Sequence, residues 1–291
     1  MLKSNVRPAR DPYAITFSHR LRLIFRDWHL NLVLGILAII TYVPLVVVLF
    51  NSFKDTRQFF TQFWLPQWPL HLDGYSRAWP SISENLINTV IYTAPTVVIT
   101  LIVSALTGYA FARYRFPGRE ILFFLILLII MLPGILLVIP MFTQIVSWNW
   151  QNSVQSIVLP YSAVQVPLGM FLMRTFFETL PANYFEAARI DGANELQLFN
   201  RIALPLALPA FATLAIVTLL FSWNDIIWPL IALFDNHKYP ISIGVLAFNT
   251  TTSTDYGATF AAYVMASLPL LLLFSFTARR FMAGLSGGIS L

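Results

Sequence analysis

Charged residues and cysteines are scarce or missing in this sequence. Asp, Glu, Lys and Arg make up 11% of its 291 residues, whereas 57% are hydrophobic; soluble domains carry about 25% charged residues. So few charges cannot cover a water-facing surface, which excludes an ordinary soluble enzyme and indicates a chain whose outside is mostly lipid. With no cysteine, disulfides, thiolate metal sites and Cys nucleophiles are excluded.

Several motifs of catalysis are missing as well. The sequence has no G-x-x-x-x-G-K-[ST] loop, so this chain does not bind and hydrolyse ATP in the Walker manner. Its four histidines show no metal-ligand spacing and no H-E-x-x-H pattern. We therefore predict a protein that is not an enzyme and holds neither a metal nor a cofactor of its own.

Long apolar runs are what the sequence does contain. Each of them is long enough to cross the ~30 Å of hydrocarbon at ~1.5 Å per residue. Prolines inside the runs predict kinks rather than separate helices, because neighbouring helices re-satisfy the freed carbonyls. The sequence thus predicts an all-α membrane protein with six transmembrane helices, at residues 30–50, 86–112, 121–145, 154–173, 204–234 and 260–278.

The basic residues are unevenly divided between the two sets of loops. Of the 18 Lys and Arg residues, fourteen lie in the N-terminal segment, the second-to-third loop, the fourth-to-fifth loop and the C-terminal tail. Because basic residues stay on the inner side of membranes, both termini are predicted to be cytoplasmic. The net charge of +5 is then explained by the basic residues of the cytoplasmic segments. We therefore expect no nucleic-acid partner.

This topology divides the chain into a cytoplasmic arm (1–29), a transmembrane domain (30–281) with an inner loop at 174–203, and a cytoplasmic tail (282–291). Basic and apolar residues alternate over 20–28. Both a short helix on the anionic inner leaflet and a merely solvated arm account for that pattern. The aromatic residues between 59 and 79 are either an interfacial belt or a docking surface.

Asp225 is the one ionisable residue well inside a predicted span. About 20 residues separate it from the inner start of that span, which places it near the outer interface. A structural carboxylate is favoured, but an ion-coupled secondary carrier or channel that uses Asp225 and no ATPase stays open as an alternative. Uncharged polar groups in spans usually hold helices together, and some line solute paths. The path candidates are Asn88, Gln144, Gln165, Asn224 and Asp225.

The inner loop predicts two short helices with a sharp corner between them. Pro181 suits a first helical turn, and Gly192 is able to end that helix in the left-handed region. Asn194 and Gln197 form a capping pair that starts the second helix. Pro205 is expected to close this second helix and to open the next span.

Two interpretations of this corner are equally consistent with the residues. Small side chains at the corner permit close approach by another protein, whose groove would receive the exposed apolar residues Leu196, Phe199 and Ile202. Alternatively, the two helices pack under their own bundle.

The loop also carries a recognisable motif. The pattern E-A-A-x-x-D-G-A, followed by x5-F-x2-I-x-L-P-x3-P, is matched in full over residues 186–209. It resembles the EAA loop of permease subunits in bacterial binding-protein-dependent ABC importers. The stretches 108–118, 139–142 and 223–229 resemble the smaller permease of the maltose-type carbohydrate branch. The resemblance covers residue 51 to the end and implies the type I ABC importer permease fold.

This resemblance implies partners and roles. The importer would contain a second, related permease, two ATPase subunits that bind ATP and Mg, and a periplasmic binding protein, in the bacterial inner membrane. Its solute would be a mono- to oligosaccharide, with acidic ones such as alginate oligosaccharide included, and composition does not choose among them. In the tail, Gly287 and Gly288 would form a further ATPase contact. The implied coupling residues are Glu186, Ala187, Ala188, Asp191, Gly192 and Ala193.

Overall fold

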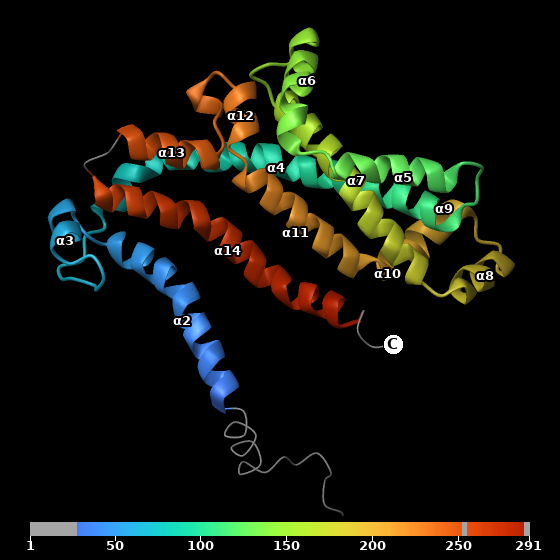
Figure 1. The fold of residues 1–291 in the computed structure, drawn as a ribbon, viewed down its shortest axis with the longest axis horizontal. Helices are drawn as coiled ribbons and strands as arrows, with labels where there is room; N and C mark the ends of the chain where they lie inside the picture. The colour runs from blue at the N-terminus through green and yellow to red at the C-terminus, as the bar shows by residue number, and fades with distance from the viewer. Residues whose placement is uncertain (1–27, 252–254, 288–291) are drawn as a thin grey trace, which may run out of the picture.

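The computed structural model describes residues 28–251 and 255–287, and its regular structure in these ranges is helical (Figure 1). The arm at 1–27 and Gly288 lie outside the described residues, and Gly287 is the last residue of its helix. The elements are α2 (Trp28–Asn51), α3 (Thr56–Thr61), α4 (Asp73–Arg113), α5 (Arg119–Ile130), α6 (Gly134–Ser147), α7 (Gln155–Thr179), α8 (Ala182–Ile190), α9 (Glu195–Leu198), the π-helix η1 (Phe199–Ala203), α10 (Leu204–Leu206), α11 (Leu208–Asn224), α12 (Ile227–Ala232), the 3-10 helix η2 (Asn236–Lys238), α13 (Ile241–Thr251) and α14 (Tyr256–Gly287).

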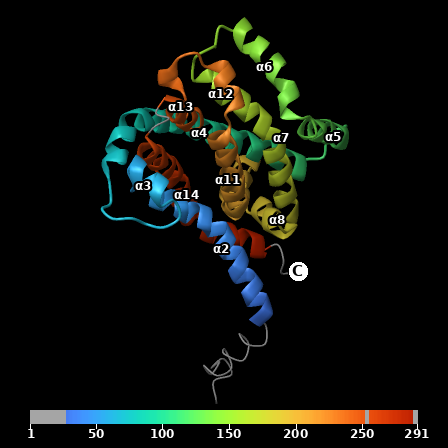
Figure 2. The same cartoon turned by 60° about the vertical axis from the view of Figure 1, so that its left-hand side comes forward.

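Four helices form the centre of the molecule. α4 packs along α7, and α11 and α14 pack against α4. α2 contacts α14 and otherwise projects away from the other helices (Figures 1 and 2). Four helices, α2, α4, α7 and α14, are individually long and apolar enough to cross a membrane, and two bent helix pairs raise the number to six if each pair is one span. The all-α membrane architecture is confirmed, whereas the count of six stays a prediction.

The expectation of kinked but continuous spans was wrong for two apolar runs. The third run divides into α5 and α6, which meet at 97°. Pro133 stands at the break as the residue that caps α6. Proline has no N–H and its ring clashes with the preceding turn, and no residue of α5 is buried against a neighbour that would hold the helix straight.

The fifth run is divided as well. The helical segment Glu195–Leu206 bends by 73° into α11, so the helix that was expected to close at Pro205 runs on to Leu206. A second break follows at Asp225 and Ile226, between α11 and α12. The second run was underestimated, since α4 has 41 residues and is therefore about 62 Å long. It extends well beyond one bilayer thickness.

Glycines set the close approach of α4 and α7. A Cβ on Gly108 would lie 2.6 Å from the Cβ of Met173, and one on Gly169 would lie 2.1 Å from Oγ of Ser104. The pairs 108 with 173 and 104 with 169 show that the two helices run in the same direction. α11 joins this pair through Leu214, which a Cβ on Gly169 would meet at 3.0 Å.

Candidate coupling segment and solute path

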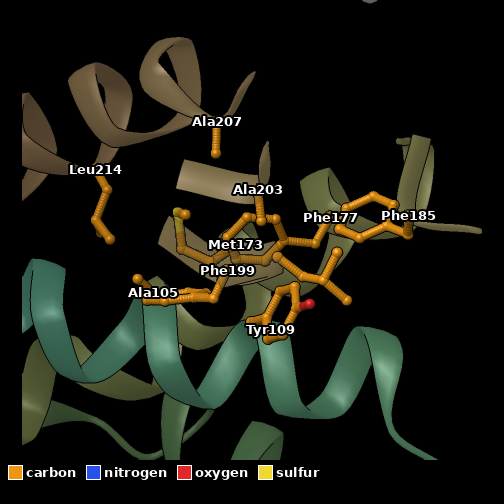
Figure 3. Close-up of a cluster of buried hydrophobic side chains, with 10 residues drawn as sticks. Ala105, Tyr109, Met173, Phe177, Phe185, Phe199, Ala203, Ala207 and Leu214 are labelled. Atoms are coloured by element: carbon orange, nitrogen blue, oxygen red, sulfur yellow. The ribbon is translucent and has the colours of Figure 1, made fainter. Parts of the chain in front are cut away.

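Phe185 anchors α8 to the rest of the molecule. Its side chain is 2% exposed and belongs to a buried cluster that also contains Tyr109, Phe177 and Phe199 (Figure 3). The ring of Tyr109 lies 5.5 Å from that of Phe177, 5.1 Å from that of Phe199 and 6.5 Å from that of Phe185. We call this group the anchor cluster. Because these residues come from α4, α7, α8 and η1, and the same buried cluster extends to Leu214 of α11, close packing couples the positions of all these helices.

Arg113, the last residue of α4, reinforces the anchor. Its Nη2 donates to the carbonyl oxygens of Phe177, at 2.8 Å, and of Leu180, at 2.9 Å. Its guanidinium carbon lies 4.0 Å from the ring centre of Phe185. Carbonyls at the end of a helix lack intrahelical partners, and a cation over a ring face is attracted to it. One side chain therefore joins the ends of α4 and α7 to α8.

The corner after α8 forms as its local sequence predicts. Gly192 has φ +85°, in the left-handed region that glycine adopts without strain. Oδ1 of Asn194 accepts from the backbone N–H of Gln197, and the side chain of Gln197 accepts from the N–H of Asn194, each at 2.9 Å. This reciprocal pair is the predicted capping box that begins α9.

An ion pair and a phenol brace the two sides of this corner. Nη2 of Arg189, on α8, lies 3.0 Å from Oε1 of Glu195, on α9. The hydroxyl of Tyr114 donates to Oε2 of the same carboxylate at 3.0 Å. Burial and this hydrogen bond raise the pKa of Tyr114 above its ordinary value. The angle between α8 and α9 is thus tied to the residue that follows α4.

The side of α8 away from the anchor cluster is open. Of the implied coupling residues, Glu186, Ala187, Asp191 and Gly192 are exposed, whereas the other two, at 188 and 193, pack partly against the anchor cluster. Ile190, at the end of α8, is 87% exposed. One face of α8 is therefore buried in its own bundle and the other is exposed.

The expected exposure of the next helix was wrong in part. Leu196 is 67% exposed as expected, but Phe199 is buried at 9% and Ile202 is partly buried against the anchor cluster. Phe199 and Ile202, both in η1, turn toward the bundle, whereas Leu196, in α9, points away from it. Of the three proposed docking residues, one is available.

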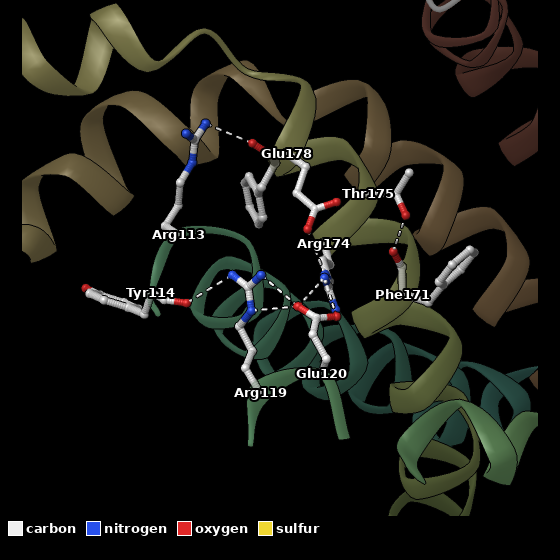
Figure 4. Close-up of polar contacts among 9 residues, drawn as sticks. Arg113, Tyr114, Arg119, Glu120, Phe171, Arg174, Thr175 and Glu178 are labelled. Carbon is white, nitrogen blue, oxygen red and sulfur yellow. Dashed lines mark hydrogen bonds and ion pairs between the residues drawn. The ribbon is translucent and has the colours of Figure 1, made fainter. Parts of the chain in front are cut away.

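An ion-pair network fixes α5 to α7 near the same end (Figure 4). Nη2 of Arg174, on α7, donates to both carboxylate oxygens of Glu120 at 3.1 Å, and its Nε donates to Glu178 at 2.8 Å. The Arg174 guanidinium carbon also lies 3.8 Å from the ring centre of Phe123. Glu120 and Phe123 are both on α5, so Arg174 holds this helix by a charge and by a ring.

The structure does not gather the predicted path residues into one cluster. Nδ2 of Asn88 donates to the carbonyl of His237 at 2.6 Å, and Gln144 is exposed on α6 and bonds to Ser147 at 3.2 Å. Asn224 is exposed and donates to the carbonyl of Leu220 at 2.8 Å. Gln165 is buried on α7 at 5% exposure.

Asp225 lies at the break between α11 and α12. Its Oδ2 accepts from the hydroxyl of Tyr161 at 2.9 Å and its Oδ1 from the N–H of Ile227 at 3.0 Å. Its carbonyl accepts from Ser242 at 2.7 Å. The bond from Ile227 satisfies the first N–H of α12, and the bond from Tyr161 ties the break to α7. Within the described residues, no group of three or more His, Asp or Glu side chains is arranged to hold a metal ion.

Sequence reasoning assigned no role to Tyr109, Arg113 or Phe185. The first two lie in the stretch 108–118 that carried the family resemblance, and Phe185 directly precedes the EAA motif. A basic residue at the inner end of a span is an ordinary topology signal. The available hint was the short distance in sequence between these residues and two recognised motifs.

Comparison with known proteins gives consistent results. The chain is 33% identical over 269 residues to the arabinooligosaccharides transport system permease protein of Halalkalibacterium halodurans, covering 90% of this chain and 95% of that protein. It is 32% identical over 257 residues to the diacetylchitobiose uptake system permease protein of Streptomyces coelicolor, covering 86% and 84%. A solved bacterial ABC transporter involved in the import of the acidic polysaccharide alginate has a chain that superposes with a TM-score of 0.76 at 25% identity, covering 93% of this chain and 100% of that one.

A family model supports the same assignment over most of the helical core. Residues 104–286 match the model described as binding-protein-dependent transport system inner membrane component. This range begins within α4 and includes α5, α7, α11 and the candidate coupling segment, by which we mean α8, α9 and η1. The chain belongs to the family of binding-protein-dependent transport system inner membrane components.

Proposed function

We propose that this chain is the permease subunit of an ATP-driven importer, and that it moves a carbohydrate delivered by a periplasmic binding protein across the bacterial inner membrane. Support comes from the family and from relatives whose names specify diacetylchitobiose, arabinooligosaccharides and, at 29% identity over 262 residues, melibiose, raffinose and stachyose. The alternative of an ion-coupled carrier that acts alone through Asp225 is not favoured, because members of this family are components of a binding-protein-dependent transport system.

The assembly contains a second, related permease and two ATPase subunits that hold ATP and Mg. Both termini of the chain and α8 face the cytoplasm, where the ATPases bind. The ATPase contact is made by Glu186, Ala187, Asp191 and Gly192, with Ala188 and Ala193 behind them, and by Gly287 and Gly288 at the end of the chain.

The observation that carries this coupling role is the two-sided environment of α8. Its outer face is exposed. Its inner face buries Phe185 in the anchor cluster. Closure of the ATPases on ATP displaces α8. Because the cluster is closely packed, the displacement moves α4, α7 and α11 as a unit and opens the path alternately to each side. Asn88, Gln144, Gln165, Asn224 and Asp225 are the candidates for lining that path.

A copurification experiment tests the coupling surface. The double variant Glu186→Lys with Gly192→Pro is expected to lose the ATPase subunits that copurify with the unaltered chain, because it reverses a charge on α8 and removes the left-handed turn. Ser81→Lys is the control, since Ser81 is exposed near the opposite end of α4, and it should retain them. ATPases that stay bound to the double variant would refute the assignment.

A further inference from the structure

A cavity of about 230 Å³ lies between α6, α7 and the break that separates α11 from α12. It is at the end of α7 opposite to α8, because α7 begins beside Trp228 and ends next to α8. Its walls combine aromatic and aliphatic side chains with one carboxylate, and include Val138, Met141, Tyr161, Phe221, Asp225 and Trp228.

The polar and aromatic groups of this cavity are held in place by contacts with one another and with the backbone of α7. Tyr161 donates its hydroxyl to Asp225, and its ring meets that of Phe221 edge to face at 5.3 Å. Nε1 of Trp228 donates to the carbonyl of Ser156 at 2.9 Å. A carboxylate has about four acceptor positions, and the two side-chain bonds of Asp225 use two of them. The rest remain for a ligand.

We propose that this cavity is a subsite for one neutral sugar ring. A sugar offers hydroxyl donors to a carboxylate and presents a C–H face to aromatic rings, and aromatic walls with a few fixed polar groups are what small-ligand sites contain. The volume is below the ~300–1,000 Å³ of sites for drug-sized ligands, so it holds a single ring. This inference rests on the proposed function and deepens it by naming the class of sugar.

The charge of the cavity selects against acidic sugars. Asp225 is the one charged residue in its lining, and no Lys or Arg lines it. A uronate placed here would bring a second carboxylate close to Asp225 with no cation between them, and like charges at short range repel. The solute class proposed here therefore differs from the acidic polysaccharide that the similar transporter imports.

The absence of cysteine from the chain permits a direct test. Met141→Cys places a thiol in the cavity lining, and Thr143→Cys places one on an exposed position of the same helix. Alkylation by N-ethylmaleimide is followed in the assembled transporter, held in lipid nanodiscs, with raffinose, arabinotriose, diacetylchitobiose or digalacturonate added. The thiols of other subunits are removed or separated by electrophoresis.

At least one neutral sugar is expected to slow alkylation of Met141→Cys threefold or more, whereas digalacturonate and the Thr143→Cys variant show no such protection. Adding Asp225→Asn should abolish the protection, while adding Asp73→Asn, the same change at an exposed position outside the cavity lining, should not. Protection by none of the neutral sugars, or equal protection by digalacturonate, would overturn the proposal.

A failure of the subsite proposal is distinguished from a failure of the proposed function by measuring ATP-driven uptake of the same sugars into proteoliposomes. Uptake without protection overturns the subsite alone. No ATP-driven uptake together with no protection overturns both. In a functioning transporter, Asp225→Asn should raise the KM for the neutral sugar about tenfold and leave kcat within twofold.

Discussion

At the scale of single residues, the Arg113 guanidinium contacts two other helices at once. It reaches two carbonyls at the end of α7 and the ring of Phe185 on α8. A planar fork with several N–H donors makes such simultaneous contacts, whereas the ammonium of lysine is a point charge on a flexible stem. Arg113 therefore acts as a positioning residue for α8.

Arg113→Lys is expected to weaken both the fold and the coupling. Hydrogen bonds to charged groups contribute about 1.5–3 kcal/mol each, and lysine retains at most part of that. The midpoint of thermal unfolding should fall, and the sugar transported per ATP hydrolysed should fall at least fivefold while ATPase binding persists. Arg115→Lys, at an exposed position two residues later, should match the unaltered chain in both measurements. Equal behaviour of the two variants would show that the fork is dispensable.

His237 and Glu84 form an exposed pair that responds to pH. Nδ1 of His237 lies 3.1 Å from Oε2 of Glu84, and the hydrogen bond and charge of this carboxylate raise the pKa of His237. A raised pKa in the folded state means that the pair stabilises the protein fully below the unfolded value of about 6.5, and that this stabilisation disappears as pH rises through the folded value.

The melting temperature of the unaltered chain should therefore exceed that of Glu84→Gln most at pH 5.5, with the difference closing by pH 8.5. Added salt should reduce the difference at pH 5.5, because the pair is exposed. A difference that grows with pH would contradict the assigned direction of the shift.

At the scale of elements, α5 depends on a polar attachment. None of its residues is buried, and Arg174 holds it through Glu120 and Phe123. Glu120→Ala should therefore speed hydrogen–deuterium exchange across 119–130 at least threefold, with α7 unchanged. Glu178→Ala removes a bond of the same arginine within α7 and should leave exchange in α5 as it was. Faster exchange in both variants would mean that the whole α7 end loosens instead.

Two glycines are required for different reasons: Gly108 because α4 and α7 pack closely there, and Gly192 because its backbone is left-handed. At Gly108 a Cβ would meet Met173 at 2.6 Å and the backbone of Arg174 at 2.8 Å. Alanine there must push α4 and α7 apart, at a cost of about 1–3 kcal/mol or more. At Gly192 a Cβ would meet nothing within 4 Å, so alanine costs only the left-handed conformation, about 1–2 kcal/mol.

Thermal unfolding in detergent should accordingly rank Gly108→Ala as the less stable of the two variants. ATPase copurification should be impaired in Gly192→Ala, whose turn forms part of the coupling surface, at temperatures where both variants are folded. A reversed order of stability would mean that α4 and α7 adjust to the added methyl without strain.

At the scale of the whole molecule, the membrane orientation is the property to test. The basic residues predict that the α8 end is cytoplasmic and that the segment after α2 is outside. Single cysteines at Asn183 and Arg57, both exposed, can be introduced into this cysteine-free chain. In intact cells stripped of the outer membrane, a membrane-impermeant maleimide should label Arg57→Cys and spare Asn183→Cys. Lysis should expose the second site, and the opposite pattern would invert the topology.

Local sequence predicted those parts of the coupling segment that depend on local interactions. Gly192 in the left-handed region and the capping box of Asn194 with Gln197 were both confirmed, because each involves residues within four positions of one another. The exposure of Phe199 was not predictable in this way. Its burial depends on Tyr109, 90 positions earlier in the chain.

The sequence by itself determined the solvent and the family. An apolar composition with few charges requires lipid around the helices, and the motif over 186–209 identifies the loop. Only the tertiary structure decided where apolar runs break and which side chains meet. Pro133 permits a break, but the sequence does not specify the 97° angle between α5 and α6, which the tertiary structure shows. Likewise, Arg113 and Phe185 come into contact only because α4 and α7 end where α8 begins, and such meetings are set by packing between helices distant in sequence.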